Sequence, residues 1–203
     1  MNDAQKLTAR QLDALREVAN IGAGHAATAL SQMTGQTIMI SVPRVNVAPL
    51  EDVPNQISEP EEPVAAVLMR MMGDLTGMTL LVFPLAAALK VAGLMMRKHV
   101  TEMGVIEQSA IKEAGNILGS AYMNALAEFM GMILMPSPPS LAIDLSDAVL
   151  SSMYVEVTQG DSYVFCVESE FILQEDQTKV RGLFLLLPDG PSLQAVLRAI
   201  RVG

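Results

Sequence analysis

The chain has 203 residues, of which 51% are apolar and only 17% carry a charged side chain, and this composition excludes an intrinsically disordered protein. The 13 basic and 22 acidic side chains give a net charge of −9, the reverse of the basic excess expected of a nucleic-acid-binding protein. The single cysteine, Cys166, excludes an intrachain disulfide, and with only His25 and His99 beside it we expect no metal site.

The first half of the chain predicts a long helix followed by strands. Apolar residues recur at steps of three and four until Gly35, a residue type that commonly ends helices. Strands are then expected at 37–42 and 44–48, an acidic, proline-rich loop at 50–63, paired strands at 64–71 and 79–83, and a second helix at 85–98. The predicted helix stripe consists of Leu12, Leu15, Ala19, Gly22, Ala26, Leu30 and Met33.

One apolar stretch, residues 78–96, approaches the roughly 20 residues that a membrane helix needs. Pro84 interrupts it and Lys90 lies in its second half, so we predict a strand and a helix rather than a membrane span. The N-terminus is polar and has no apolar signal-peptide core. We therefore expect a cytoplasmic protein.

The second half of the chain predicts a similar order of elements. A helix is expected from near Thr101 to Met130, with an apolar stripe that includes Ile106, Ile111, Ala114, Leu118, Leu126 and Phe129. Further expected elements are strands at 133–135, 154–157, 163–167 and 181–187, a short helix at 144–153 and a terminal helix at 192–200.

An internal repeat relates the two halves. Residues 17–21, Glu-Val-Ala-Asn-Ile, recur 96 positions later at 113–117 as Glu-Ala-Gly-Asn-Ile, and Gly35 falls on Gly131 at the same offset. We predict two copies of one unit, about 1–100 and 101–203, in a single domain spanning 1–203. The expected fold class is α/β, a layered domain with a pseudo-twofold repeat and its long helices packed on a largely antiparallel sheet.

Polar residues follow one face of each long helix. Asp13, Glu17 and Asn20 are spaced four and three apart, which places them together opposite the apolar stripe. Ser109, Glu113 and Asn116 repeat this arrangement on the second long helix. Glutamate and asparagine are common on solvated helix faces, but asparagine is a modest helix former, and here it recurs in register with glutamate. The repetition favours two equivalent functional sites.

These residues resemble the signature of the CheC/CheX/FliY family of phosphatases in bacterial chemotaxis. In the first copy, Asp13, Glu17 and Asn20 are followed by Pro43 after 22 intervening residues. In the second copy, Ser109, Glu113 and Asn116 are followed by Pro139 after the same number. The family accepts aspartate or serine at the first position, and both occur in this chain.

The resemblance implies dephosphorylation of the response regulator CheY. In this interpretation Asn20 and Asn116 orient a water for in-line attack on the aspartyl phosphate, and Glu17 and Glu113 bind a cation on CheY, such as its active-site lysine. A neutral amide suits this role because it accepts from and donates to water without repelling the phosphoryl group.

The remaining motif residues are expected at the rim of each site. Asp13 and Ser109 would contact or orient the docked CheY, and the two prolines would shape the turn beneath the site. Mg²⁺ is expected in the acidic pocket of CheY, so no cofactor is expected in this chain.

Family likeness also implies a second partner, the receptor-modifying deamidase CheD. The segment 143–153, Ile-Asp-Leu-Ser-Asp-Ala-Val-Leu-Ser-Ser-Met, has an acidic edge and an apolar face. Its candidate contact residues are Asp144, Leu145, Asp147 and Val149, although an ordinary surface helix covering the sheet would have the same pattern. We expect a monomer or a heterodimer with CheD, and neither a nucleic-acid nor a membrane partner.

The sequence also bears on two other classes of protein. A conventional hydrolase is disfavoured, because the chain has no Gly-x-Ser-x-Gly elbow and no phosphate-binding loop of the Walker type. A non-catalytic adaptor that regulates CheD or the flagellar switch is the alternative to a phosphatase. Two intact glutamate–asparagine pairs favour catalysis, since an adaptor needs neither amide.

Overall fold

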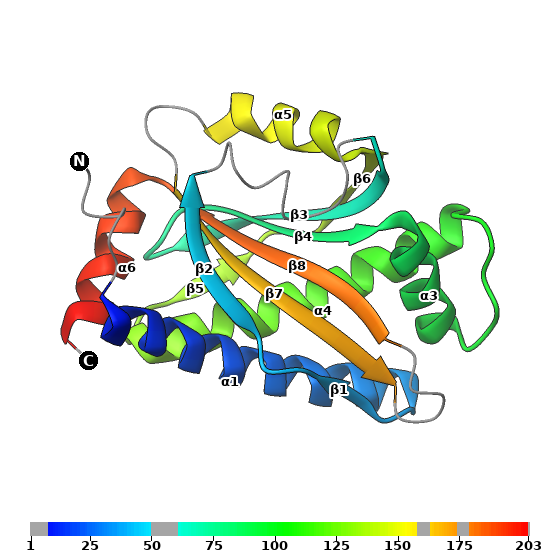
Figure 1. Cartoon of the computed structure of the whole chain (residues 1–203), viewed down its shortest axis with the longest axis horizontal. Helices are drawn as coiled ribbons and strands as arrows, with labels where there is room; N and C mark the ends of the chain where they lie inside the picture. Colours follow the sequence, from blue (N-terminus) through cyan, green and yellow to red (C-terminus); the bar gives the residue numbers. More distant parts are fainter. Residues whose placement is uncertain (1–7, 50–60, 158–162, 174–178, 203) are drawn as a thin grey trace.

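The computed structural model describes residues 8–49, 61–157, 163–173 and 179–202. Its centre is an antiparallel sheet in the order β1-β7-β8-β4-β3-β5, with β2 also paired to β7 and β6 to β3 (Figure 1). The strands are β1 (Ile38–Ile40), β2 (Arg44–Pro49), β3 (Pro63–Gly73), β4 (Gly77–Pro84), β5 (Leu134–Pro136), β6 (Ser140–Leu145), β7 (Tyr163–Leu173) and β8 (Lys179–Pro188). The helices are α1 (Ala9–Thr34), α3 (Leu85–Met96), α4 (Val105–Met130), α5 (Ser146–Val157) and α6 (Gly190–Val202).

The sheet has the predicted pseudo-twofold symmetry. Strands β1 and β2 follow α1 but pair with β7, whereas β5 and β6 follow α4 but pair with β3. At the centre β4 pairs with β8, with Leu81 opposite Phe184. The predicted layered α/β fold is confirmed, and each repeat completes its sheet with strands from the other.

The long helices α1 and α4 pack against each other on one face of the sheet and run in opposite directions (Figure 1). Close approach is possible because Gly22 lies against Tyr122, where a Cβ atom on the glycine would stand 2.6 Å from Tyr122 Cδ1. The main core lies between these helices and the sheet, and a second apolar cluster, which includes Val149 of α5, covers the opposite face. The polar faces of α1 and α4 are thereby turned outward.

The predicted end of α1 at Gly35 is confirmed, and the structure adds where the helix begins. Thr8 and Gln11 form a capping box at the start, and Gly35 ends the helix in the left-handed conformation with φ 68°. Gly131, at φ 64°, ends α4 in the same way. The start of α4 was predicted too early, because Gly104 is its N-cap.

Parts of the predicted apolar stripes are wrong. Met33 is 46% exposed, Ile106 67% and Phe129 38%, so these residues lie near the helix ends and outside the core. The helical period identifies the buried face correctly, as Leu15, Ala19 and Ala26 of α1 show. It does not say how far along the helix the sheet extends.

The region around α5 differs most from the prediction. Residues 140–145 form the strand β6 on β3, so the helix begins at Ser146 and not at Asp144. The strand predicted at 154–157 is the end of α5. Apolar residues alternate in β6 at Leu141, Ile143 and Leu145, but the strand that pairs with them lies more than 70 positions away. Most of the loop predicted at 50–63 lies outside the described residues.

The long apolar stretch at 78–96 divides as predicted. It forms most of β4 and then α3, and Pro84 is both the last residue of the strand and the N-cap of the helix. None of the helices in the described part of the chain is long and apolar enough to cross a membrane.

Candidate functional site

Two polar ridges lie on the solvent-facing sides of α1 and α4. Ridge 1 consists of Asp13, Glu17 and Asn20, all exposed. Ridge 2 consists of Ser109, Glu113 and Asn116, of which the first two are exposed and Asn116 is half-buried. The structure therefore places all six predicted site residues where a second protein can reach them.

The helix backbone fixes the spacing within each ridge. Asn20 lies three residues after Glu17, which separates their Cβ atoms by roughly 5–6 Å along one face. Glu113 and Asn116 have the same relation in α4. A carboxylate and an amide at this spacing can contact two groups of one guest protein at the same time.

The opposite face of each helix is anchored in the core. Leu15, Val18 and Ala19 hold α1, and Ile111 and Ala114 hold α4, each 6% exposed or less. Because the helices are packed along this face, the backbone beneath the ridges is held in place.

The first residues of the two ridges make different local contacts. Asp13 Oδ1 accepts a hydrogen bond from Arg16 Nη1 at 2.9 Å, and both side chains are exposed. The Ser109 hydroxyl donates to the carbonyl oxygen of Val105 at 3.0 Å. Ridge 1 thus begins with an ion pair and ridge 2 with an uncharged group.

The glutamates and asparagines of the ridges make no side-chain hydrogen bond or ion pair within residues 8–49, 61–157, 163–173 and 179–202. Their polar groups are solvated and available to a guest. The repeat also places a cation directly before each glutamate, Arg16 and Lys112. The sequence interpretation did not use this pair, although the same offset would have found it.

The two motif prolines lie near the ends of the edge strands. Pro43 is buried directly before β2, and Pro139 is half-buried directly before β6. Both lie in short irregular segments that link two strands, 41–43 between β1 and β2 and 137–139 between β5 and β6.

Other reactive groups offer no competing site. Cys166 is buried in β7, and burial raises the pKa of its thiol to about 12, so it carries no thiolate at neutral pH. Within the described segments, no group of three or more His, Cys, Asp or Glu side chains is placed to hold a metal ion.

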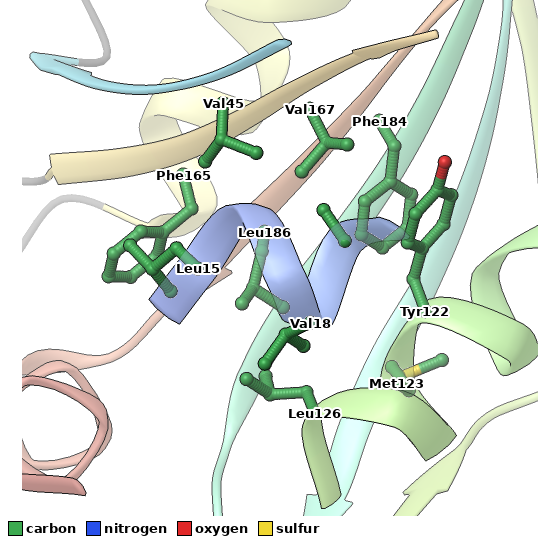
Figure 2. Close-up of a pocket in the computed structure, with 11 residues that line it drawn as sticks. Leu15, Val18, Val45, Tyr122, Met123, Leu126, Phe165, Val167, Phe184 and Leu186 are labelled. Atoms are coloured by element: carbon green, nitrogen blue, oxygen red, sulfur yellow. The ribbon is translucent and has the colours of Figure 1, made fainter. Parts of the chain in front are cut away.

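A cavity of about 40 Å³ lies beneath ridge 1, between α1, α4 and the sheet (Figure 2). Apolar side chains such as Leu15, Leu126 and Phe184 line it, and the Tyr122 hydroxyl is already hydrogen-bonded to Ser169 at 2.9 Å. Because this cavity has no polar group free to orient a reacting substrate, the two ridges remain the candidate functional surface.

The predicted CheD contact is only partly exposed. Asp144 and Leu145 are exposed at the end of β6, and Asp147 is exposed in the first turn of α5. Val149 is 5% exposed and packs in the second apolar cluster, so its assignment as a surface contact is wrong. It faces the sheet because α5 packs against β3 and β6.

Comparison with known proteins identifies the class to which this fold and these ridges belong. The model of the CheC-like family matches residues 11–47 and 106–143, and each match contains one complete motif, from ridge to proline. The chain belongs to the CheC-like family.

Individual relatives cover nearly the whole chain. The "CheY-P phosphatase CheC" of Bacillus subtilis is 31% identical over 195 residues, which is 94% of this chain and 93% of that protein. The crystal structure of Thermotoga maritima FliY superposes with a TM-score of 0.80 at 26% identity, covering 97% of this chain and 98% of the other. The FliM middle domain of H. pylori, at 14% identity and a TM-score of 0.68, covers 95% and 99% and shows the same fold.

Proposed function

We propose that the chain is a cytoplasmic phosphatase of phosphorylated CheY. The observation that carries the proposal is the pair of glutamate–asparagine ridges, which are accessible to solvent and have no side-chain partner among the described residues, within the two segments that match the CheC-like family. The name of the Bacillus subtilis relative, a CheY-P phosphatase, supports the choice of substrate.

The proposed reaction is hydrolysis of an aspartyl phosphate. Water attacks phosphorus in line, the bond between phosphorus and the aspartate oxygen breaks, and the products are the free carboxylate, inorganic phosphate and a proton. This mixed anhydride is already reactive, so positioning the water supplies much of the acceleration. The amide oxygen of Asn20 or Asn116 accepts a hydrogen bond from that water, and the amide NH₂ donates to a phosphoryl oxygen.

Glu17 and Glu113 are proposed to hold CheY in place. Each lies one helical turn before its asparagine and is exposed, and its carboxylate can pair with a cation such as the active-site lysine of CheY. Asp13 and Ser109 lie one turn earlier, at the rim of the contact. Mg²⁺ belongs in this proposal to the acidic pocket of CheY, and the chain supplies no ligand to it.

The test is the decay of CheY labelled with radioactive phosphate, followed in Mg²⁺ with and without the chain. We expect the chain to accelerate decay catalytically, with a substoichiometric amount clearing the labelled CheY. The adaptor alternative predicts that CheY-P binds to the chain and decays at its unassisted rate. That outcome would reject the phosphatase.

We also propose that CheD binds at the exposed junction of β6 and α5, through Asp144, Leu145 and Asp147. Replacing both aspartates by lysine is expected to weaken capture of CheD at least tenfold in a pull-down, because it reverses the charge of the contact. Glu128→Lys, an exposed charge reversal near the end of α4, is the matched control. Equal loss of CheD binding in both variants would contradict the assignment.

A further inference from the structure

The two ridges differ most at the helix starts that precede them. Val105 and Ile106 are the first two residues of α4, and they are 80% and 67% exposed. At the equivalent positions α1 begins with Ala9 and Arg10. Two large apolar side chains in solvent, on an otherwise solvated helix start, are present in one copy only.

These side chains are continuous with ridge 2. Val105 lies one turn before Ser109, whose hydroxyl donates to the Val105 carbonyl oxygen, and Ile106 lies three residues before Ser109. At about 100° per residue, Val105 and Ile106 flank the line from Ser109 to Asn116 on either side. A docked guest that covers ridge 2 therefore meets both.

The distance from Val105 to Asn116 is also short enough for a single protein interface to cover both residues. Val105 and Asn116 are eleven positions apart, which corresponds to about 16 Å along the helix axis. A protein interface of ordinary size buries about 800 Å² on each partner, a patch with a radius of about 16 Å. A protein centred on Asn116 thus reaches the helix start.

The surfaces around the two ridges also differ in charge. Arg10 precedes ridge 1, and Asp13, its first residue, is paired with Arg16; all three are exposed. Val105 and Ile106 precede ridge 2, and neither they nor Ser109, its first residue, carries a charge. The nearest ion pair there joins Lys98 to Glu107, and Glu107 lies on the opposite side of α4 from the ridge, with 14% of its side chain exposed.

We propose that Val105 and Ile106 form an apolar docking rim for phosphorylated CheY at ridge 2, whereas ridge 1 docks the same protein through charge. This inference rests on the proposed function and makes the two sites unequal in how they recognise one guest. Apolar burial responds weakly to ionic strength, and exposed charge pairs are screened by it. Glu17 and Glu113 contribute a charge pair at both ridges, so ridge 2 should lose less affinity at high salt than ridge 1.

The test uses chains with one working site. Asn20→Ala leaves ridge 2, and Asn116→Ala leaves ridge 1. Adding Val105→Ser and Ile106→Ser to the ridge 2 chain is expected to raise KM for CheY-P about tenfold at unchanged kcat, because docking is lost and the water is still positioned. The same two substitutions leave KM of the ridge 1 chain unchanged.

A matched control is Ile133→Ser, which removes an equally exposed apolar side chain (68%) at the other end of α4. We expect it to leave KM for CheY-P unchanged in both the ridge 1 chain and the ridge 2 chain. Raising NaCl from about 50 to 300 mM should increase KM several-fold for ridge 1 and less than twofold for ridge 2. Equal KM changes at both ridges, or none at ridge 2, would overturn the proposal.

Failure of the phosphatase proposal can be distinguished from failure of the docking proposal by measuring binding instead of catalysis. If the unmodified chain does not accelerate decay, binding of CheY activated with beryllium fluoride still reports docking. At 300 mM NaCl, Val105→Ser with Ile106→Ser should then weaken that binding about tenfold relative to Ile133→Ser. Unchanged binding would reject the apolar rim, whatever the chain catalyses.

Discussion

Replacing Asn20 and Asn116 together by alanine is expected to abolish the acceleration of CheY-P decay, with a loss of at least about a hundredfold in kcat/KM. Alanine cannot orient the attacking water, whereas the docking glutamates Glu17 and Glu113 remain. Each single variant retains the activity of the other ridge. The measurement is the initial rate of phosphate release at several CheY-P concentrations.

Asn124→Ala is the control for this prediction, because Asn124 is an exposed asparagine two turns beyond ridge 2 on the same helix. It should leave the rate unchanged. All three substitutions are at exposed or half-buried helix positions, so the free energy of unfolding should change by no more than about 0.5–1 kcal/mol. A double variant that accelerates decay as well as the unmodified chain would refute the assignment of the amides.

The largest expected effect on stability comes from Gly115→Val, directly before Asn116. A Cβ atom at Gly115 would lie 2.5 Å from Cγ1 of Val67, a side chain of β3 that is fully buried. The whole contact lies in the core, so α4 must move away from the sheet. We expect a loss of about 3 kcal/mol in the free energy of unfolding, measured by urea denaturation.

Gly24→Ala is expected to change the free energy of unfolding in the opposite direction. Gly24 is exposed in α1, and a Cβ atom there meets nothing within 4 Å. Alanine should therefore stabilise the chain by about 1 kcal/mol through helix propensity alone. If Gly115→Val leaves the free energy of unfolding unchanged or raises it, close packing of α4 on β3 is not what requires Gly115.

The ridges could be predicted from sequence because the signals that define them are local. Helical spacing brings Glu17 and Asn20 onto one face, and repetition 96 positions later distinguishes the pair from ordinary surface residues. Gly35 likewise marks the helix end by its own conformational preference. None of these inferences needs the position of another element.

The errors concern residues whose state depends on distant neighbours. Strand β6 forms because β3 offers a free edge, and a local pattern that included Leu145 and Val149 at helical spacing concealed it. The burial of Val149 follows from the position of that strand. Ile106 belongs to the apolar pattern of α4 but lies where nothing covers it, and this is visible only once the sheet is in place.

The exchange of edge strands makes the two repeats mutually dependent. Ser41, which follows α1, accepts a hydrogen bond from the backbone of Glu170, 129 positions later, and β1 and β2 have no other strand in the described sheet to pair with. Cutting the chain between α3 and α4 would give two fragments. Each would lack the edge strands that the other half adds to its sheet. Neither half then forms a complete sheet on its own, and a substitution that disrupts β7 in the second half also removes the strand that β1 and β2 pair with in the first.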